Sequence, residues 1–191
     1  EQMQTGFYCD YGSGENPTLA VRCDLDALPI EEINVIDYCS INKGVSHACG
    51  HDSHMANILG LAAYIIETEQ KISGRLRFLF QPAEEIAPGG AVVMIKAGAI
   101  NGVDHIIGGH VLPTLSPEKI GIRYGPMAAT VERLDITLKG PGGHTSRPAE
   151  SVDLIWAQSH LVISLEESIK HRLDQREPVV LAFGQLEGGH T

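Results

Sequence analysis

Four residues of this sequence have the types and the spacing of a metal-ligand set. Cys49 and His51 lie two positions apart, and Glu85 and His110 follow later in the chain. Zinc-like divalent ions bind thiolate, imidazole and carboxylate groups, and these residues provide all three. Two ions about 3.5–4 Å apart need more ligands than these, usually with a bridging group. We therefore predict a divalent-metal site whose visible ligand set is incomplete.

The adjacent residues Glu84 and Glu85 can divide the work of a hydrolytic site. One carboxylate binds metal, while its neighbour takes a proton from the attacking water and passes it to a leaving nitrogen, as amide hydrolysis requires. The alternative is a solvated acidic turn, which is the commoner meaning of an isolated Glu-Glu pair. The position of this pair after a predicted strand favours the catalytic interpretation.

Other residues of the His-rich segment have simpler explanations. A lone histidine near a helix start more often makes structural hydrogen bonds than binds metal, and we interpret His47 and His54 in this way. Cys49 taken alone is more typical of a buried core thiol, and His110 alone is unremarkable. Only the combination indicates a metal.

Three short apolar runs are predicted to be strands that carry these residues. They cover 18–23, 76–80 and 105–109, and they are followed by Asp24 and Asp26, by the Glu84-Glu85 pair and by His110, in that order. Apolar residues from Met55 to Ile66 recur with helical spacing, with Asp52 or Ser53 as N-cap, and 90–96 is a second candidate helix. The alternation predicts a parallel sheet, which binds ligands beyond the carboxyl ends of its strands.

The pattern changes around 121–127, which indicates a second unit. Alternating apolar residues predict a strand over 134–138, a long amphipathic helix is expected over 152–169, and 179–186 is another candidate strand. We therefore divide the chain into residues 1–122 and residues 123–191.

Composition limits the classes of partner. The 191 residues are 43% hydrophobic and 20% charged, as in ordinary globular proteins, and 14 Lys and Arg against 24 Asp and Glu give a formal charge of −10. Nucleic acid and anionic membranes are poor partners for such a chain. We find no run of about 20 apolar residues and no basic-then-apolar leader, so we expect a cytoplasmic protein. The four cysteines are not dispersed like a disulfide scaffold and are expected to be reduced.

Four short strings occur in one order and at natural spacing: Asp-Leu-Asp-Ala-Leu-Pro (24–29), His-Ala-Cys-Gly-His-Asp (47–52), Gln-Pro-Ala-Glu-Glu (81–85) and Gly-Gly-His (108–110). Together they resemble the M20 metallopeptidase family, in the amidohydrolase branch that contains hippurate hydrolases, N-acyl-amino-acid amidohydrolases and auxin-conjugate hydrolases. The likeness runs from about Leu19 to His190. Each string alone is weak, and the set in register is specific.

The resemblance implies roles for individual residues. Cys49, His51, Glu85 and His110 are similar to the family's metal ligands, and Glu84 to its general base. Asp26 is similar to the acid near the metal, which we expect to orient a ligand through a hydrogen bond. His144 is similar to a histidine of the smaller domain, implied to reach an active site and stabilise the substrate oxyanion or carboxylate. A loop-packing role is the alternative for His144.

The implied fold is α/β: a partial zinc-peptidase-like three-layer catalytic domain in 1–122, and the start of an inserted α/β ferredoxin-like lid, often used for dimerisation, in 123–191. Family members are considerably longer, and the last histidine ligand is expected C-terminal to residue 191. Two ions per site (zinc, manganese, cobalt or nickel) and a homodimer through the lid are also implied.

The expected activity is hydrolysis of the amide bond of N-acyl amino acids, with Glu84 activating water. Alternatives are a catalytically incomplete fragment, a metal- or ligand-binding module without turnover on the same fold, and a dipeptidase or aminopeptidase that prefers free N-termini.

Overall fold

The computed structural model of this chain describes residues 5–13, 17–128, 130–174, 176 and 179–189. They form two compact units, Glu1–Ile122 and Arg123–Thr191. The catalytic and lid roles of these units stay predictions.

The first unit is built on a four-stranded sheet in the order β1-β3-β2-β4. The strands are β1 (Phe7–Tyr11), β2 (Thr18–Asp24), β3 (Arg75–Gln81) and β4 (His105–Gly108). β2 runs parallel to both β3 and β4, which confirms the predicted parallel sheet. β1 was not predicted, because Phe7–Tyr11 does not alternate apolar and polar residues and is mostly exposed; it pairs antiparallel with β3.

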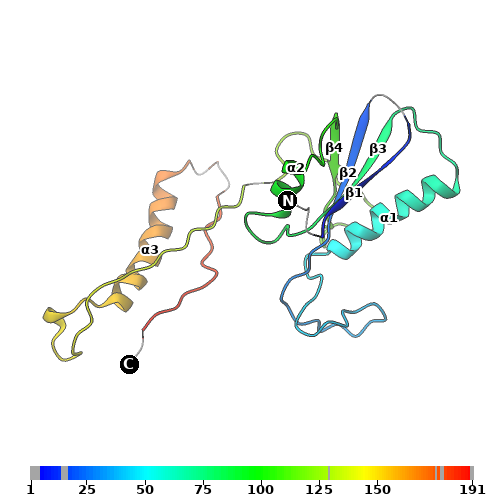
Figure 1. Ribbon diagram of the computed structural model, residues 1–191. Coiled ribbons are helices and arrows are strands. Elements are labelled where there is room, and N and C mark those ends of the chain that lie inside the picture. Colours follow the sequence, from blue (N-terminus) through cyan, green and yellow to red (C-terminus); the bar gives the residue numbers. More distant parts are fainter. Residues whose placement is uncertain (1–4, 14–16, 129, 175, 177–178, 190–191) are drawn as a thin grey trace. The chain divides into compact units, whose positions relative to one another are not determined.

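Helices lie against both faces of this sheet, α1 (His51–Glu67) on one and α2 (Gly90–Lys96) on the other (Figure 1). Successive residues of β3 point to opposite faces, so it contributes to two cores. Phe78 and Phe80 pack with Ile58 and Ile65 of α1, whereas Leu79 packs with Met94 of α2. The result is a three-layer α/β arrangement, as expected.

The start of α1 differs from the prediction. Its N-cap is Gly50, at φ 85°, and not Asp52 or Ser53. Glycine adopts this left-handed conformation without a steric cost, so the chain can turn sharply between Cys49 and His51. The helix therefore begins at His51, one turn before the apolar periodicity indicates. Its buried face consists of His51, His54, Ile58 and Ile65.

The second unit contains a short 3₁₀ helix (Pro148–Glu150) and α3 (Leu154–Arg172), which confirms the predicted long helix. Asp153 caps α3 by accepting a hydrogen bond from the Trp156 amide at 2.8 Å. The predicted strands at 134–138 and 179–186 are wrong: neither segment pairs as a strand in the part of the chain that is described. A strand needs a hydrogen-bonded neighbour, which local alternation cannot guarantee. Among the described helices, none has the length and apolarity to cross a membrane.

Candidate metal centre

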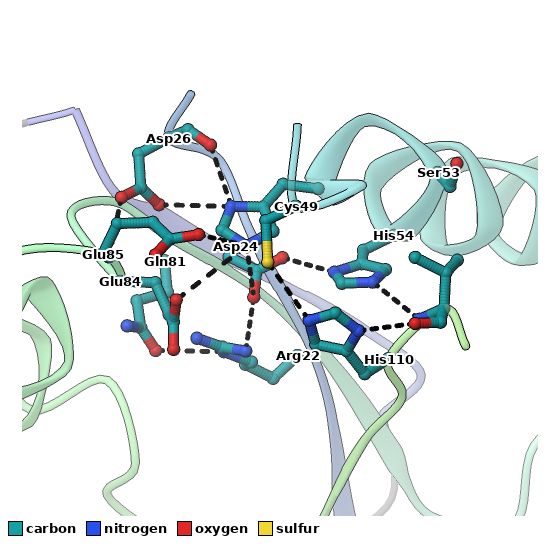
Figure 2. A network of polar contacts seen from close by, with 12 residues as sticks. Arg22, Asp24, Asp26, Cys49, Ser53, His54, Gln81, Glu84, Glu85 and His110 are labelled. Carbon is teal, nitrogen blue, oxygen red and sulfur yellow. Dashed lines mark hydrogen bonds and ion pairs between the residues drawn. The ribbon is translucent and has the colours of Figure 1, made fainter. Parts of the chain in front are cut away.

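The predicted site residues of the first unit gather beyond the carboxyl ends of β2, β3 and β4 (Figure 2). Asp24 is the last residue of β2, and the glutamate pair follows β3 by three positions. Ligand atoms of Cys49, His51 and His110 all lie within 4.8 Å of one another, and so do those of His51, Glu84 and Glu85. His51 is common to both groups and is the centre of the cluster.

His51 directs one free ring nitrogen into this cluster. The side chain is 1% exposed, and its Nδ1 atom lies 2.8 Å from the main-chain oxygen of Asp26. A carbonyl can only accept, so we assign the ring proton to Nδ1 and the lone pair to Nε2. Nε2 has no hydrogen-bond partner among the described residues. A backbone carbonyl on one nitrogen and a bare lone pair on the other are typical of metal-binding histidines.

Carboxylate oxygens surround the free Nε2 of His51 without bonding to it. Oε1 of Glu85 lies 3.6 Å away, Oδ2 of Asp24 3.7 Å and Oε2 of Glu84 3.9 Å. Nitrogen-to-oxygen distances in hydrogen bonds do not exceed about 3.2 Å, so all these distances are too long for a hydrogen bond. The buried Oε1 of Glu85 also lacks a partner in the described chain. Two unpaired buried atoms facing each other are costly unless something lies between them.

Cys49 and His110 form the opposite side of the cluster. The Nδ1 atom of His110 donates to the Val111 carbonyl at 2.8 Å, which leaves the lone pair on Nε2, and the Cys49 thiol lies within hydrogen-bond distance of this Nε2, with Sγ at 3.4 Å. Burial, together with the nearby carboxylate of Glu85, raises the pKa of the Cys49 thiol to about 11. A coordinated cation has the opposite effect and removes the thiol proton.

The two glutamates differ in exposure. The Glu85 side chain is 23% exposed and the Glu84 side chain 41%. The Glu85 amide donates to Oδ2 of Asp26 at 2.9 Å, which fixes the loop after β3. Burial raises the pKa of the Asp26 carboxyl, but hydrogen bonds from the backbone outweigh it, and the net pKa is lowered. Asp26 therefore contacts His51 through its carbonyl and Glu85 through its carboxylate.

These residues fit a divalent metal. Ligand atoms at about 2.1 Å from a tetrahedral ion are separated by about 3.4 Å. The observed separations are 3.4 Å between Cys49 and His110, and 3.6 Å between His51 and Glu85. Thiolate, imidazole and carboxylate are the donor types that such ions accept. The ligand atoms fall into two groups, Cys49 with His51 and His110, and His51 with Glu84 and Glu85. The roles of Cys49, His51, Glu85 and His110 as ligands stay a prediction.

Asp24 and His54 form a buried pair under the cluster. Nδ1 of His54 is 2.6 Å from Oδ1 of Asp24, and the Arg22 guanidinium contacts Oδ2 at 2.7 Å. Burial raises the pKa of Asp24, but the His54 hydrogen bond and the Arg22 charge outweigh it, so the net pKa is lowered.

Sequence reasoning missed Arg22 and left Asp24 unassigned. The signal that could have found Asp24 is its position at the strand end, two residues before Asp26.

His144 lies in the second unit. Its Nδ1 lies 2.9 Å from the Ser146 hydroxyl, and both residues are exposed. Its role in an active site stays a prediction.

A mixed α/β sheet with a thiolate, imidazoles and carboxylates at the carboxyl ends of its three parallel strands defines a candidate metallohydrolase. Comparison with known proteins then specifies the class. Residues 20–190 match the family described as peptidase family M20/M25/M40, so the chain belongs to this family. The resemblance expected from the four sequence strings is confirmed.

Curated relatives match nearly all of this chain. The N-acyl-L-amino acid amidohydrolase of Geobacillus stearothermophilus is 44% identical over 178 residues, which are 92% of this chain and 48% of that protein. The N-acetyl-L-cysteine deacetylase of Bacillus subtilis (strain 168) is 38% identical over 190 residues, 99% of this chain and 45% of that protein. The chain therefore spans about half the length of the curated relatives it matches.

Two solved structures agree with this family assignment. A protein of methicillin-resistant Staphylococcus aureus named as an aminohydrolase superposes with a TM-score of 0.78 at 36% identity, covering 97% of this chain and 50% of its own. A Bacillus subtilis protein described as a dinuclear metal-binding peptidase of the M20 family has a TM-score of 0.54 at 43% identity, over 59% of this chain and 31% of its own.

Proposed function

We propose that the first unit forms part of the active site of a metal-dependent amidohydrolase that cleaves N-acyl amino acids into a carboxylic acid and a free amino acid. The observation that carries the proposal is the buried Nε2 of His51, which faces Oε1 of Glu85 at 3.6 Å; neither atom has a hydrogen-bond partner among the described residues. The N-acyl-amino-acid hydrolases among the relatives support the substrate class.

The chain's own residues divide the work in this proposal. Cys49, His51, Glu85 and His110 hold the divalent metal, and the Asp26 carbonyl keeps the proton of His51 on Nδ1, so that Nε2 is free to bind. Bound there, divalent ions supply a Lewis acid for the amide carbonyl and lower the pKa of water. Zinc, manganese, cobalt and nickel are the candidates, with two ions in a complete site.

Glu84 is the proposed general base. Its side chain is the more exposed of the pair and points to the same cluster, with Oε2 3.9 Å from Nε2 of His51. From this position it can take a proton from the attacking water and return it to the departing amine nitrogen. His144 would add a hydrogen bond to the substrate oxyanion or carboxylate. Homodimerisation through residues 123–191 and a cytoplasmic location complete the proposal.

The test is a hydrolysis assay with N-acetyl, N-benzoyl and N-indoleacetyl amino acids. The chain, loaded with each of the four metals, is compared with a longer protein that contains it. Release of free amino acid by either supports the proposal. Cleavage of dipeptides with free N-termini, without cleavage of N-acyl substrates, would favour a dipeptidase or aminopeptidase. Metal binding without hydrolysis by both proteins would favour a binding module.

A further inference from the structure

His54 has both ring nitrogens in hydrogen bonds, although it lies one helical turn from His51 on the same buried face. Nδ1 contacts Asp24 at 2.6 Å, and the main-chain amide of Val111 donates to Nε2 at 3.0 Å. An amide can only donate, so Nε2 carries the lone pair and Nδ1 the proton. With neither nitrogen free, His54 is not available as a metal ligand, even though it lies close to Asp24 and His51.

Asp24 maintains this tautomer. Its side chain is 2% exposed, its Oδ1 accepts the Nδ1 proton of His54, and its Oδ2 accepts a hydrogen bond from Arg22 at 2.7 Å. Arg22 is held in turn by Gln81, which accepts from Nε at 3.0 Å. The buried carboxylate is thus paired on both oxygens, as a buried charge must be. The proton on Nδ1 is what leaves Nε2 able to accept from Val111.

The Val111 amide, which donates this hydrogen bond, belongs to the segment that carries His110. This segment follows β4 through Gly108 and Gly109, and no described residue lies within 4 Å of the Cβ position of either glycine. Side-chain packing at these glycines therefore does little to hold it. The imidazoles of His54 and His110 meet edge to face, with centroids 4.7 Å apart, and the His110 Nδ1 contacts the Val111 carbonyl.

We propose that His54 is a positioning residue: it holds the Val111 amide and thereby keeps Nε2 of His110 beside Sγ of Cys49. Arg22 and Asp24 act through it, by fixing its tautomer. The proposal rests on the metal-binding role of His110 in the proposed function, but its tests do not require hydrolysis.

The first test measures the hydrogen bond itself in the metal-free chain. An N–H···N bond between Val111 and His54 transmits a scalar coupling between the two nitrogens, which NMR detects in protein labelled with ¹⁵N. We expect this coupling, together with the His54 proton on Nδ1. Its absence, or protonation of Nε2, overturns the proposal, whether or not metal binds and whatever the hydrolysis assay shows.

The second test uses substitutions and Co²⁺ as the probe. His54→Gln can place its amide oxygen near the former Nε2 and keep the bond to Val111, whereas His54→Asn reaches only the position of Nδ1. We expect His54→Asn to weaken Co²⁺ binding about 10–100-fold, the usual effect of losing a group that orients a ligand. His54→Gln should recover most of this loss, and the thiolate-to-cobalt absorption band should return with it.

His105→Asn is the matched control, because His105 is an exposed histidine of β4 and should bind Co²⁺ like the wild type. Equal Co²⁺ affinity in His54→Asn and wild type would contradict a positioning role. Equal damage in His54→Asn and His54→Gln, with a cobalt spectrum that has lost a nitrogen ligand, would make His54 a ligand instead. Circular dichroism identifies any variant that does not fold, and the coupling measurement then decides.

Discussion

The Sγ atom of Cys49 lies 3.4 Å from Nε2 of His110, although 61 positions separate the two residues. Cys49 precedes α1, and His110 follows β4, so the parallel sheet brings them to the same edge. The contact forms the side of the candidate metal centre that lies opposite the two glutamates.

Cys49→Ser is expected to weaken Co²⁺ binding strongly. Loss of a group that only orients a ligand weakens metal binding about 10–100-fold, and loss of a ligand should cost more. Serine does not provide the thiolate that soft and borderline ions prefer, so the thiolate-to-cobalt band should disappear. Absorption titration measures both effects. Cys9→Ser, at an exposed cysteine of β1, is the control and should leave the band intact. Retention of the band in Cys49→Ser would remove Cys49 from the ligand set.

Co²⁺ affinity should also rise with pH. The pKa of the Cys49 thiol is raised to about 11 in the metal-free protein, so at neutral pH the thiol must lose a proton when metal binds. Lower pH favours the protonated thiol and opposes binding, and higher pH favours the complex. Titration calorimetry in buffers of different ionisation enthalpy should detect the released proton. Cys49→Ser should release fewer protons, and an unchanged number would contradict this account.

Glu84→Gln and Glu85→Gln are expected to separate catalysis from metal binding. Glutamine at 84 removes the proposed base but no ligand, so metal content should stay near normal while hydrolysis falls by about 10²–10⁴-fold. Glutamine at 85 should weaken metal binding, because the half-buried Glu85 carboxylate lies within reach of His51. Metal analysis and the N-acyl amino acid assay, made on the same active protein, test this division. Equal loss of metal and activity in Glu84→Gln would reject the base assignment.

Gly50→Ala should destabilise the first unit and displace the His110 segment. Gly50 has φ 85°, and a Cβ atom there would clash with Cγ2 of Val111. The left-handed backbone alone costs an alanine about 1–2 kcal/mol, and Val111 must also move. Urea denaturation and Co²⁺ titration measure the two effects. Gly60→Ala is the matched control: it lies inside α1 with nothing within 4 Å of its Cβ position, and should stabilise by about 0.5–1 kcal/mol.

Asp10→Ala is expected to destabilise the sheet at neutral pH by about 1.5–3 kcal/mol, because it removes charged hydrogen bonds. Arg77 of β3 donates to Asp10 at 2.7 and 2.8 Å. The Arg77 hydrogen bond lowers the pKa of Asp10 below its ordinary value, despite burial. The stabilisation is therefore fully present above the unfolded pKa of about 3.9, and disappears as pH falls through the lower folded pKa.

Urea denaturation of wild type and Asp10→Ala at neutral and acidic pH tests this, and the difference in unfolding free energy should shrink in acid. A difference that does not depend on pH would show that the charge of Asp10 is not involved. Glu166→Gln is the control: it removes an exposed ion pair with Lys170, which water screens, and should change neither measurement.

Elements of the first unit that are buried on a regular pattern were predictable from the sequence. The apolar runs of β2 and β3 predict buried strands, and the periodicity of α1 predicts the buried Ile58 and Ile65, although Leu59 and Ile66 of the same pattern are exposed. β1 was not predictable, since its edge position depends on the backbone of β3 and leaves most of its side chains exposed. For 134–138 and 179–186 the error was the reverse, since strands were predicted where the structure has none. Alternation of apolar and polar residues does not make a strand without a pairing partner.

The sequence by itself determined the donor types, their places after the strands and the family, since each depends on residue identity along the chain. Tertiary structure alone decided which atoms meet: the Asp26 carbonyl on His51, the 3.4 Å approach of Cys49 to His110, and the use of both nitrogens of His54. The physical reason is that a lone pair becomes available or occupied only when a donor or acceptor from a distant segment faces it. His51 and His54 have the same side chain on the same helix face, and only their partners distinguish a candidate ligand from a positioning residue.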